Sequence, residues 1–282
     1  MPSETTIVHA ADGTPLLRRT WSAPRPVGGV YLLHGLGEHT GRYDHVAAVL
    51  VALGLTVRGH DHRGFGESGG RRATIPYDDA LLDDARLQFD AFAAEQRAAV
   101  LTRAPFLLGH SMGGGNAARA VTGGWIAPRG LVLSSPALVP RISWIERVAA
   151  RIGRRIVPNL RMPHRLPMTM VSHDPEVIAA IARDRLMHLL VTPRLVAFML
   201  DAGERALADA ARCTVPTLLQ VAGDDRFVRP EAARRFAAAL PAGTLRVYAP
   251  LYHEVYNALA ANRAEVLEDL REWMSAQLAR AS

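Results

Sequence analysis

The feature that most constrains the fold is a repeated alternation of short apolar runs with longer helical patterns. Gly, Pro or Asp bound the apolar runs, which include GGVYLLHG from residue 28, PFLLGHS from residue 105 and PTLLQVAGDD from residue 216. Stretches with helical spacing follow them, such as RYDHVAAVLVALG, GGGNAARAV and PEAARRFAAAL. Alternating strands and helices require crossover connections, which make the strands parallel and cover both faces of the sheet with helices. The sequence therefore predicts an α/β fold with a mostly parallel central sheet flanked by helices.

Two segments depart from this alternation. The N-terminal stretch TTIVHAADGTPLLRRTW has Asp12 and Gly13 between two strand-like runs, which predicts an antiparallel hairpin at one edge of the sheet. Residues 137–212 are helical in pattern and contain prolines at positions 158, 163, 167, 175 and 193. We therefore expect a core formed by residues 1–136 and 213–282, with a helical module inserted between two strands.

Length and composition exclude several classes of protein. At 282 residues, 49% of them hydrophobic, the chain can bury one large core or two modest ones. No apolar run approaches the roughly 20 residues that span a bilayer, and the start MPSETTIVHAADG lacks the basic-then-apolar order of a signal peptide. Cys213 is the single cysteine, which rules out an internal disulfide framework and agrees with a reducing compartment. We therefore expect a cytoplasmic globular protein.

The net charge is concentrated in one tract. Residues 141–165 contain seven arginines and one acid, Glu146, so this tract carries about +6, as does the whole chain. Three interpretations are open: a nucleic-acid patch, a membrane-surface element, or part of a flap over an active site. Every basic residue is arginine in an alanine-rich chain, which is typical of codon bias, and no basic stripe is interleaved with aromatic residues. We therefore expect no nucleic-acid partner.

A candidate nucleophile lies where an apolar run meets a helical one. The segment FLLGHSMGG places Ser111 between Gly109 and Gly113, directly after a predicted strand and directly before a predicted helix. A serine held on such a sharp turn needs small residues two positions to either side, because the backbone folds close upon itself. The pattern G-x-S-x-G alone also fits an ordinary glycine-rich turn, but the strand-turn-helix context favours a nucleophile.

The base and the acid that would activate this serine come later in the chain. After the strand pattern resumes at Val215, the chain contains one histidine, His253, in the loop after the apolar run TLRVYA. On a fold with such a serine turn the acid precedes the histidine, and LLQVAGDDRFVRP offers Asp224 and Asp225 at the end of the preceding strand. The sequence therefore predicts Ser111 as nucleophile and His253 as base, with either aspartate as the acid.

Acyl transfer also needs N–H donors for the oxyanion of the tetrahedral intermediate. The backbone N–H of Met112, the residue after the serine, is one candidate. The second is the N–H of Leu36 in HGLG, where glycines let the backbone turn in after a strand. The cluster His60, Asp61 and His62 offers metal-ligand chemistry, but it lacks the further spaced ligands of a metallohydrolase, so we expect no metal site.

Five motifs occur in order from about Thr14 to the C-terminus: HGLGEHTGRYDHVAAVL, GHDHRGFGESGG, GHSMGG, GDDRFV and YHEVYN. Together they resemble the monoacylglycerol lipase and lysophospholipase branch of the α/β-hydrolases. The resemblance implies the α/β-hydrolase fold, with Ser111 as nucleophile, Asp225 as acid and His253 as base.

The same resemblance places the oxyanion donors on Leu36 and Met112 and a cap over an acyl pocket at residues 137–212. It implies no cofactor and a small-molecule lipid ester as the partner. We therefore expect a serine ester hydrolase that cleaves monoacylglycerol or a related single-chain lipid ester through an acyl-enzyme. Two alternatives stay open: a short-chain carboxylesterase acting on soluble esters, and a catalytically silent ligand-binding protein of the same fold.

Part of the arginine-rich tract has helical spacing between Ser143 and Val157. An apolar stripe recurs along it, formed by Trp144, Ile145, Val148, Ile152 and Ile156. The other sides of this helix carry Arg147, Arg151, Arg154 and Arg155. One hypothesis is that the apolar stripe packs on the core while the arginines form a solvated face. The other is a transient membrane-surface contact, in which the stripe enters anionic lipid and the arginines meet headgroups.

Overall fold

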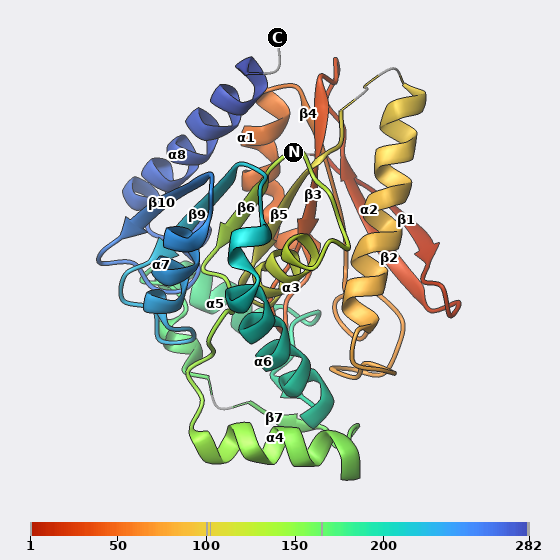
Figure 1. Ribbon diagram of the computed structural model, residues 1–282, viewed down its shortest axis with the longest axis vertical. Helices are drawn as coiled ribbons and strands as arrows, with labels where there is room; N and C mark the ends of the chain where they lie inside the picture. The colour runs from red at the N-terminus through yellow and green to blue at the C-terminus, as the bar shows by residue number, and fades with distance from the viewer. Residues whose placement is uncertain (1, 100, 102, 165, 281–282) are drawn as a thin grey trace.

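The computed structural model describes residues 2–99, 101, 103–164 and 166–280 (Figure 1). Its strands are β1 (Glu4–His9), β2 (Pro15–Trp21), β3 (Gly28–Leu33), β4 (Leu55–His60), β5 (Phe106–His110), β6 (Leu131–Ser134), β7 (Met162–Pro163), β8 (Leu190–Val191), β9 (Thr217–Ala222) and β10 (Gly243–Tyr248). Its α-helices are α1 (Asp44–Ala52), α2 (Ala80–Ala98), α3 (Ser111–Thr122), α4 (Trp144–Ile156), α5 (Pro175–Arg183), α6 (Pro193–Ala208), α7 (Pro230–Ala239) and α8 (Ala260–Ala279).

Among the described residues, the main sheet has the strand order β1-β2-β4-β3-β5-β6-β9-β10. Neighbouring strands from β4 to β10 in this order pair in parallel. The β1–β2 hairpin is antiparallel, with Glu4 opposite Thr20, and it occupies one edge. The α/β prediction, the mostly parallel sheet and the N-terminal edge hairpin are therefore confirmed.

Helices cover both faces of this sheet (Figure 1). Side chains of α2, α3 and α7 pack on one face in a large apolar cluster that includes Phe89, Ala117 and Phe236. Side chains of α1 and α8 pack on the other face, in a cluster that includes Leu50 and Trp273. Strands β3, β5, β6 and β9 are buried along almost their whole length, since neither face of the sheet meets water. The apolar runs of the sequence are continuous for this reason.

The chain between β6 and β9 contains α4, α5, α6 and a short ladder of β7 and β8. Helix α6 carries Leu195 and Phe198 into the same apolar cluster as α2 and α3, so it anchors this segment to the sheet. Helix α4 packs against α6 at the end of the molecule farthest from the C-terminus (Figure 1). The ladder pairs Met162 with Val191. Strands of two residues are too short for a periodic pattern, so no sequence signal predicts them.

Helix α4 presents its apolar stripe to solvent. The helix begins with a capping box, in which the side chains of Ser143 and Glu146 each accept a hydrogen bond from the other's backbone N–H. Trp144, Ile152 and Ile156 expose 74%, 53% and 72% of their surface. The hypothesis that this stripe packs on the core is therefore wrong.

Three of the four arginines of α4 pair with acids of α6. Arg147 and Arg151 lie 3.6 and 2.6 Å from carboxylate oxygens of Glu204, and Arg154 lies 2.6 Å from Asp201. These two carboxylates offset part of the positive charge that the tract shows as a sequence, and the pairs hold the polar side of α4 against its neighbour. Within the described part of the chain, no helix is both long enough and apolar enough to cross a bilayer.

Candidate active site

Ser111 lies on the sharp turn between β5 and α3, with a backbone φ of 50°. Few residues other than glycine adopt such a positive φ, and a strained serine of this kind is typical of a nucleophile elbow. The chain passes close to itself on both sides of the serine. A Cβ on Gly109 would lie 2.4 Å from the carbonyl oxygen of Gly113, and a Cβ on Gly113 would lie 2.2 Å from that of Leu33. Both positions therefore require glycine.

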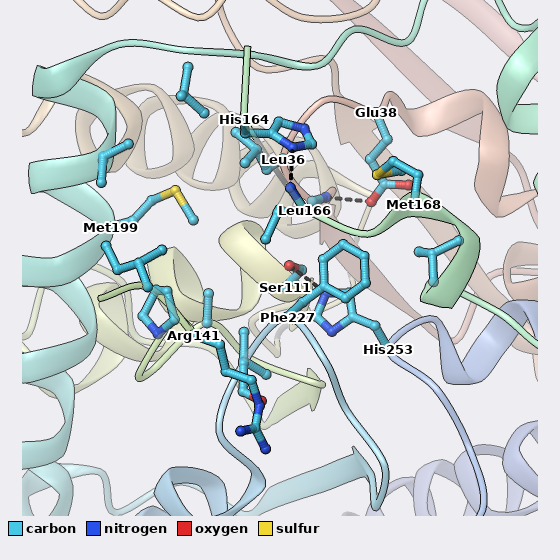
Figure 2. A pocket seen from close by; sticks show the side chains of 18 of the residues that line it. Leu36, Glu38, Ser111, Arg141, His164, Leu166, Met168, Met199, Phe227 and His253 are labelled. Atoms are coloured by element: carbon cyan, nitrogen blue, oxygen red, sulfur yellow. Dashed lines mark hydrogen bonds between the residues drawn. The ribbon is translucent and has the colours of Figure 1, made fainter. Parts of the chain in front are cut away.

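The structure brings three predicted site residues together at the carboxyl edge of the sheet. Oγ of Ser111 lies 2.8 Å from Nε2 of His253, and Nδ1 of His253 lies 2.7 Å from Oδ2 of Asp225. Asp225 follows β9 and His253 follows β10, which are neighbouring parallel strands. Figure 2 shows Ser111 and His253 joined beside a cavity, and Phe227 stacks on the imidazole at a centroid distance of 4.8 Å.

The surroundings of Asp225 keep its carboxyl ionised. Its Oδ1 accepts hydrogen bonds from the N–H groups of Phe227 at 2.8 Å and Val228 at 3.0 Å. Burial raises the pKa of this carboxyl, but His253 and the two backbone donors outweigh burial and lower it. Burial likewise lowers the pKa of His253, but the Asp225 carboxylate outweighs burial and raises it above its ordinary value. The pair is thus arranged to stabilise an imidazolium.

Two titratable neighbours of these residues are directed elsewhere. The side chain of Asp224 is 42% exposed and pairs with Arg226 at 2.7 Å. Nδ1 of His110, beside the elbow serine, lies 3.0 Å from the hydroxyl oxygen of Ser134. The structure therefore brings one of the two candidate aspartates to the imidazole, and it leaves His110 outside this chain of hydrogen bonds.

The two predicted oxyanion donors border the serine. The loop after β3 passes so close that a Cβ on Gly35 would lie 3.2 Å from Cβ of Ser111. Among the described residues, none accepts a hydrogen bond from the N–H of Leu36 in this loop. The N–H of Met112 lies in the first turn of α3, where helical N–H groups have no acceptor within the helix. The geometry leaves both groups available to an oxygen atom beside Ser111.

A buried ionic network beside the histidine loop was not predicted from the sequence. Arg42 donates to both carboxylate oxygens of Glu254, at 2.7 Å each, and to Glu38 at 2.6 Å. The Tyr43 hydroxyl donates to Glu38 at 2.6 Å. The network joins the loop of Leu36 to the loop that carries the predicted base. A signal was present, because one acid follows the histidine directly and the other precedes Arg42 by four residues.

Replacing Arg42 with methionine is expected to lower the free energy of unfolding by about 3–5 kcal/mol. The change leaves the carboxylates of Glu38 and Glu254 without a counter-ion. Water cannot replace it well, because the two side chains are only 4% and 7% exposed. Urea unfolding measures the loss. Arg226→Met is the matched control, since it breaks an exposed pair worth at most about 1 kcal/mol. Equal losses in the two variants would contradict this interpretation of the network.

A cavity of about 590 Å³ borders Ser111 and His253. Its volume is typical of a site that encloses a small organic molecule. Most of its wall comes from the segment between β6 and β9, and apolar side chains predominate (Figure 2). Examples from that segment are Ile142, Leu166, Met168, Val171, Val196 and Met199. This arrangement suits a ligand with a long apolar part and a polar group at the serine.

Buried histidines lie next to the loop of Leu36. The Tyr31 hydroxyl lies 2.7 Å from Nδ1 of His60, and the His62 N–H donates to Nε2 of His34 at 2.9 Å. Across the residues that the structure describes, no group of His, Cys, Asp and Glu is arranged to hold a metal ion. Burial lowers the pKa of both His34 and His60 to about 3. These rings are therefore neutral at neutral pH and serve as hydrogen-bonding supports for the loop.

Mild acid is expected to destabilise the fold. Histidine in an unfolded chain has a pKa of about 6.5, whereas burial lowers the pKa of His34 and His60 to about 3 and that of His110 to about 4. Between these values the unfolded state binds more protons, so the free energy of unfolding falls as pH falls, by up to about 1.4 kcal/mol per pH unit for each ring. Urea midpoints between about pH 7.5 and about pH 5 measure this slope. A flat profile would contradict the prediction.

Comparison with known proteins places this chain in a family. A family model, Hydrolase_4, described as serine aminopeptidase S33, matches residues 24–259. The chain is 33% identical to the monoacylglycerol lipase of Mycolicibacterium smegmatis, in an alignment that covers 99% of this chain and 100% of that protein. It is 29% identical to an uncharacterized abhydrolase domain-containing protein of Dictyostelium discoideum, where 99% of this chain aligns with 30% of the other.

A solved structure is similar over nearly the whole fold. The crystal structure of Paleococcus ferrophilus monoacylglycerol lipase superimposes with a TM-score of 0.83 at 30% sequence identity, covering 93% of this chain and 99% of that one. The family match includes the elbow, both later loops and the segment between β6 and β9. The resemblance of the sequence motifs is thereby confirmed. The chain belongs to the Hydrolase_4 family, in the monoacylglycerol lipase branch of the α/β-hydrolases.

Proposed function

We propose that this chain is a serine ester hydrolase that cleaves monoacylglycerols, and that residues 137–212 act as a cap over the acyl pocket. The observation that carries this proposal is the chain of hydrogen bonds from Asp225 through His253 to Ser111, beside a mainly apolar cavity. The monoacylglycerol lipases among the similar proteins support the substrate class.

The proposed reaction has two halves. Oγ of Ser111 attacks the ester carbonyl carbon while its proton moves to Nε2 of His253, and the N–H groups of Leu36 and Met112 hold the oxyanion. The C–O bond to the alcohol then breaks, and His253 gives its proton to the departing oxygen. In the second half water attacks the acyl-enzyme, His253 takes a proton from that water and returns it to Oγ, and the fatty acid leaves. Asp225 keeps the imidazole in the required tautomer and stabilises the imidazolium.

A short-chain carboxylesterase is the second candidate. Burial of each methylene group contributes about 0.8 kcal/mol, and a short acyl chain would leave much of the apolar wall of a 590 Å³ cavity unused. A long single acyl chain fits the wall better. A silent ligand-binding protein is disfavoured, because such a protein needs neither the strained Ser111 nor an imidazole aligned on it.

A panel of glycerol monoesters, with acyl chains from about 2 to about 18 carbons, tests the proposal. We expect kcat/KM to rise with acyl length over the short and medium chains. Each added methylene is buried against the apolar lining of the cavity, which stabilises the transition state. Activity that is highest on the shortest esters would establish the carboxylesterase instead. Binding of the esters without any release of fatty acid would establish the silent protein.

We further propose that the protein acts as a peripheral cytoplasmic enzyme and touches lipid through the apolar stripe of α4. Trp144 and Ile156 are exposed on this helix, while Ala149 and Ala150 of the same helix line the cavity. A lipid ester leaving a membrane at the stripe would therefore meet the pocket one helix away. Because the α4 arginines are largely paired with acids of α6, apolar insertion should contribute more than attraction to anionic headgroups.

Co-sedimentation with phosphatidylcholine vesicles tests the membrane contact. Wild-type protein should bind at both low and high salt, and a Trp144→Ser, Ile156→Ser double variant should lose most of this binding. Ile7→Ser is the control, since Ile7 is 54% exposed on β1, outside the cap segment. Binding only to anionic vesicles at low salt would favour arginine–headgroup contacts instead. If the wild-type protein binds neither phosphatidylcholine vesicles nor anionic vesicles at low salt, the membrane proposal is wrong.

A further inference from the structure

A neutral imidazole from the cap segment faces the cavity. His164 lines the cavity, and Figure 2 shows its ring near Leu36 and Leu166. The Leu166 N–H donates to Nδ1 of His164 at 3.3 Å, so the neutral ring carries its proton on Nε2. Burial, together with the nearby His188, lowers the pKa of His164 to about 4. At neutral pH this ring is an uncharged N–H donor.

His188 shows the same local arrangement with its donor satisfied. Each of the two histidines begins a His-x-Leu sequence in which the leucine N–H donates to Nδ1 at 3.3 Å. Nε2–H of His188 donates to the carbonyl oxygen of Gly64 at 3.0 Å, which ties the cap segment to the core. For Nε2 of His164, the described part of the chain provides no acceptor. The two rings differ in that one is bonded to the core and the other faces the cavity.

Backbone hydrogen bonds hold His164 next to the loop of the predicted oxyanion donor. The His164 N–H donates to the carbonyl oxygen of Leu189 at 2.7 Å, and the N–H of His188 donates to that of Gly37 at 3.1 Å. Gly37 directly follows Leu36 in the chain. His164 therefore directly follows β7, and it pairs with a segment that is itself bonded to this loop. Its ring lines the same cavity as Leu36 and Ser111.

We propose that Nε2–H of His164 donates a hydrogen bond to a hydroxyl oxygen in the alcohol part of the ester, and so selects polyol esters over esters of simple alkanols. This inference rests on the ester hydrolysis proposed above. The carboxylates of Glu38 and Glu254 also line the cavity, but Arg42 already holds both. A half-buried donor without an acceptor gains from one that the ligand supplies. A neutral donor suits an uncharged hydroxyl group.

The test compares two esters of the same acyl chain, monolauroylglycerol and methyl laurate, in the wild-type protein and in His164→Phe. Phenylalanine keeps a ring of similar shape but removes the donor. We expect kcat/KM for the glycerol ester to fall about five- to tenfold, and that for methyl laurate to change less than about twofold. His164→Gln, whose amide N–H reaches a similar position, should restore most of the preference. His164→Leu is a second apolar variant if the phenylalanine protein does not fold.

A purely structural role of His164 would lower both rates alike. Equal losses for the two esters, or an unchanged ratio in a folded variant, would therefore overturn the inference. Equal kcat/KM values for the two esters in the wild-type protein would also overturn it, while ester hydrolysis would stand. Cleavage of neither ester by the wild-type protein would remove the proposed function as well, so the two failures are distinguishable.

Discussion

Replacing Ser111 with alanine is expected to lower kcat for monoacylglycerol hydrolysis by about 10⁵-fold or more. The change removes the oxygen that is to attack the ester, and it leaves the cavity and the His253–Asp225 pair in place. The measurement is the rate of fatty-acid release, compared with the rate in the absence of protein. A folded Ser111→Ala protein that retained more than about 1% of the activity would contradict Ser111 as the nucleophile.

The same experiment has a stricter form. His253→Ala should cost nearly as much as Ser111→Ala, because a serine hydroxyl is a weak nucleophile without its base. The double variant should then be no slower than the worse single variant, since residues that act as one unit give strongly non-additive losses. Losses that multiply would mean that Ser111 and His253 act independently, despite the 2.8 Å between Oγ and Nε2.

Replacing Asp225 with asparagine is expected to lower kcat by about 10⁴-fold. An amide has nearly the shape of the carboxylate, but it carries no charge to stabilise the imidazolium and can favour the wrong tautomer of His253. The loss should therefore appear in kcat more than in the midpoint of thermal unfolding. Steady-state rates on a glycerol monoester measure it.

Asp224→Asn is the matched control for this change. Asp224 is the chain neighbour of Asp225, but its side chain is 42% exposed and pairs with Arg226. We expect its loss to be less than about twofold, since the group has no contact with the imidazole to lose. A larger loss at Asp224 than at Asp225 would show that the acid is assigned to the wrong residue.

The sheet could be predicted from the sequence because its strands are buried on both faces. Burial on both faces makes the apolar runs continuous, and the helical spacing between them then requires parallel strands. The elbow could be predicted for a similar reason, since close backbone contact leaves only glycine at positions 109 and 113. In both cases a local requirement, burial of the strands or close backbone contact at the elbow, restricts which residue types can occupy consecutive positions.

The orientation of α4 could not be predicted, because helical periodicity shows that a stripe exists and does not say what lies opposite it. The acids that pair with its arginines, Glu204 and Asp201, come about 50 residues later in the chain. The residues alone also do not decide whether Asp224 or Asp225 is the acid that pairs with His253. Only the resemblance favoured Asp225, and the contrast between a buried and an exposed side chain becomes visible once β9 and β10 are placed side by side.

The network of Arg42 with Glu38 and Glu254 was missed because it joins segments about 210 residues apart. In a sequence, a charged residue next to a predicted base can equally be an ordinary solvent-exposed side chain. Its meaning depends on burial, since an exposed pair contributes little and a buried one is costly to break. The position of the proton on the His164 ring likewise depends on which backbone N–H donates to Nδ1, and a sequence does not show this contact.

The central claim is that Ser111 is an activated nucleophile for acyl transfer. The most direct measurement is labelling of the folded wild-type protein with an alkyl fluorophosphonate, followed by mass spectrometry of the intact chain and of its peptides. We expect about one adduct per chain, on the peptide that contains Ser111, and none in Ser111→Ala or His253→Ala. Folded wild-type protein that takes up no fluorophosphonate, or takes it up on another residue, would contradict the claim.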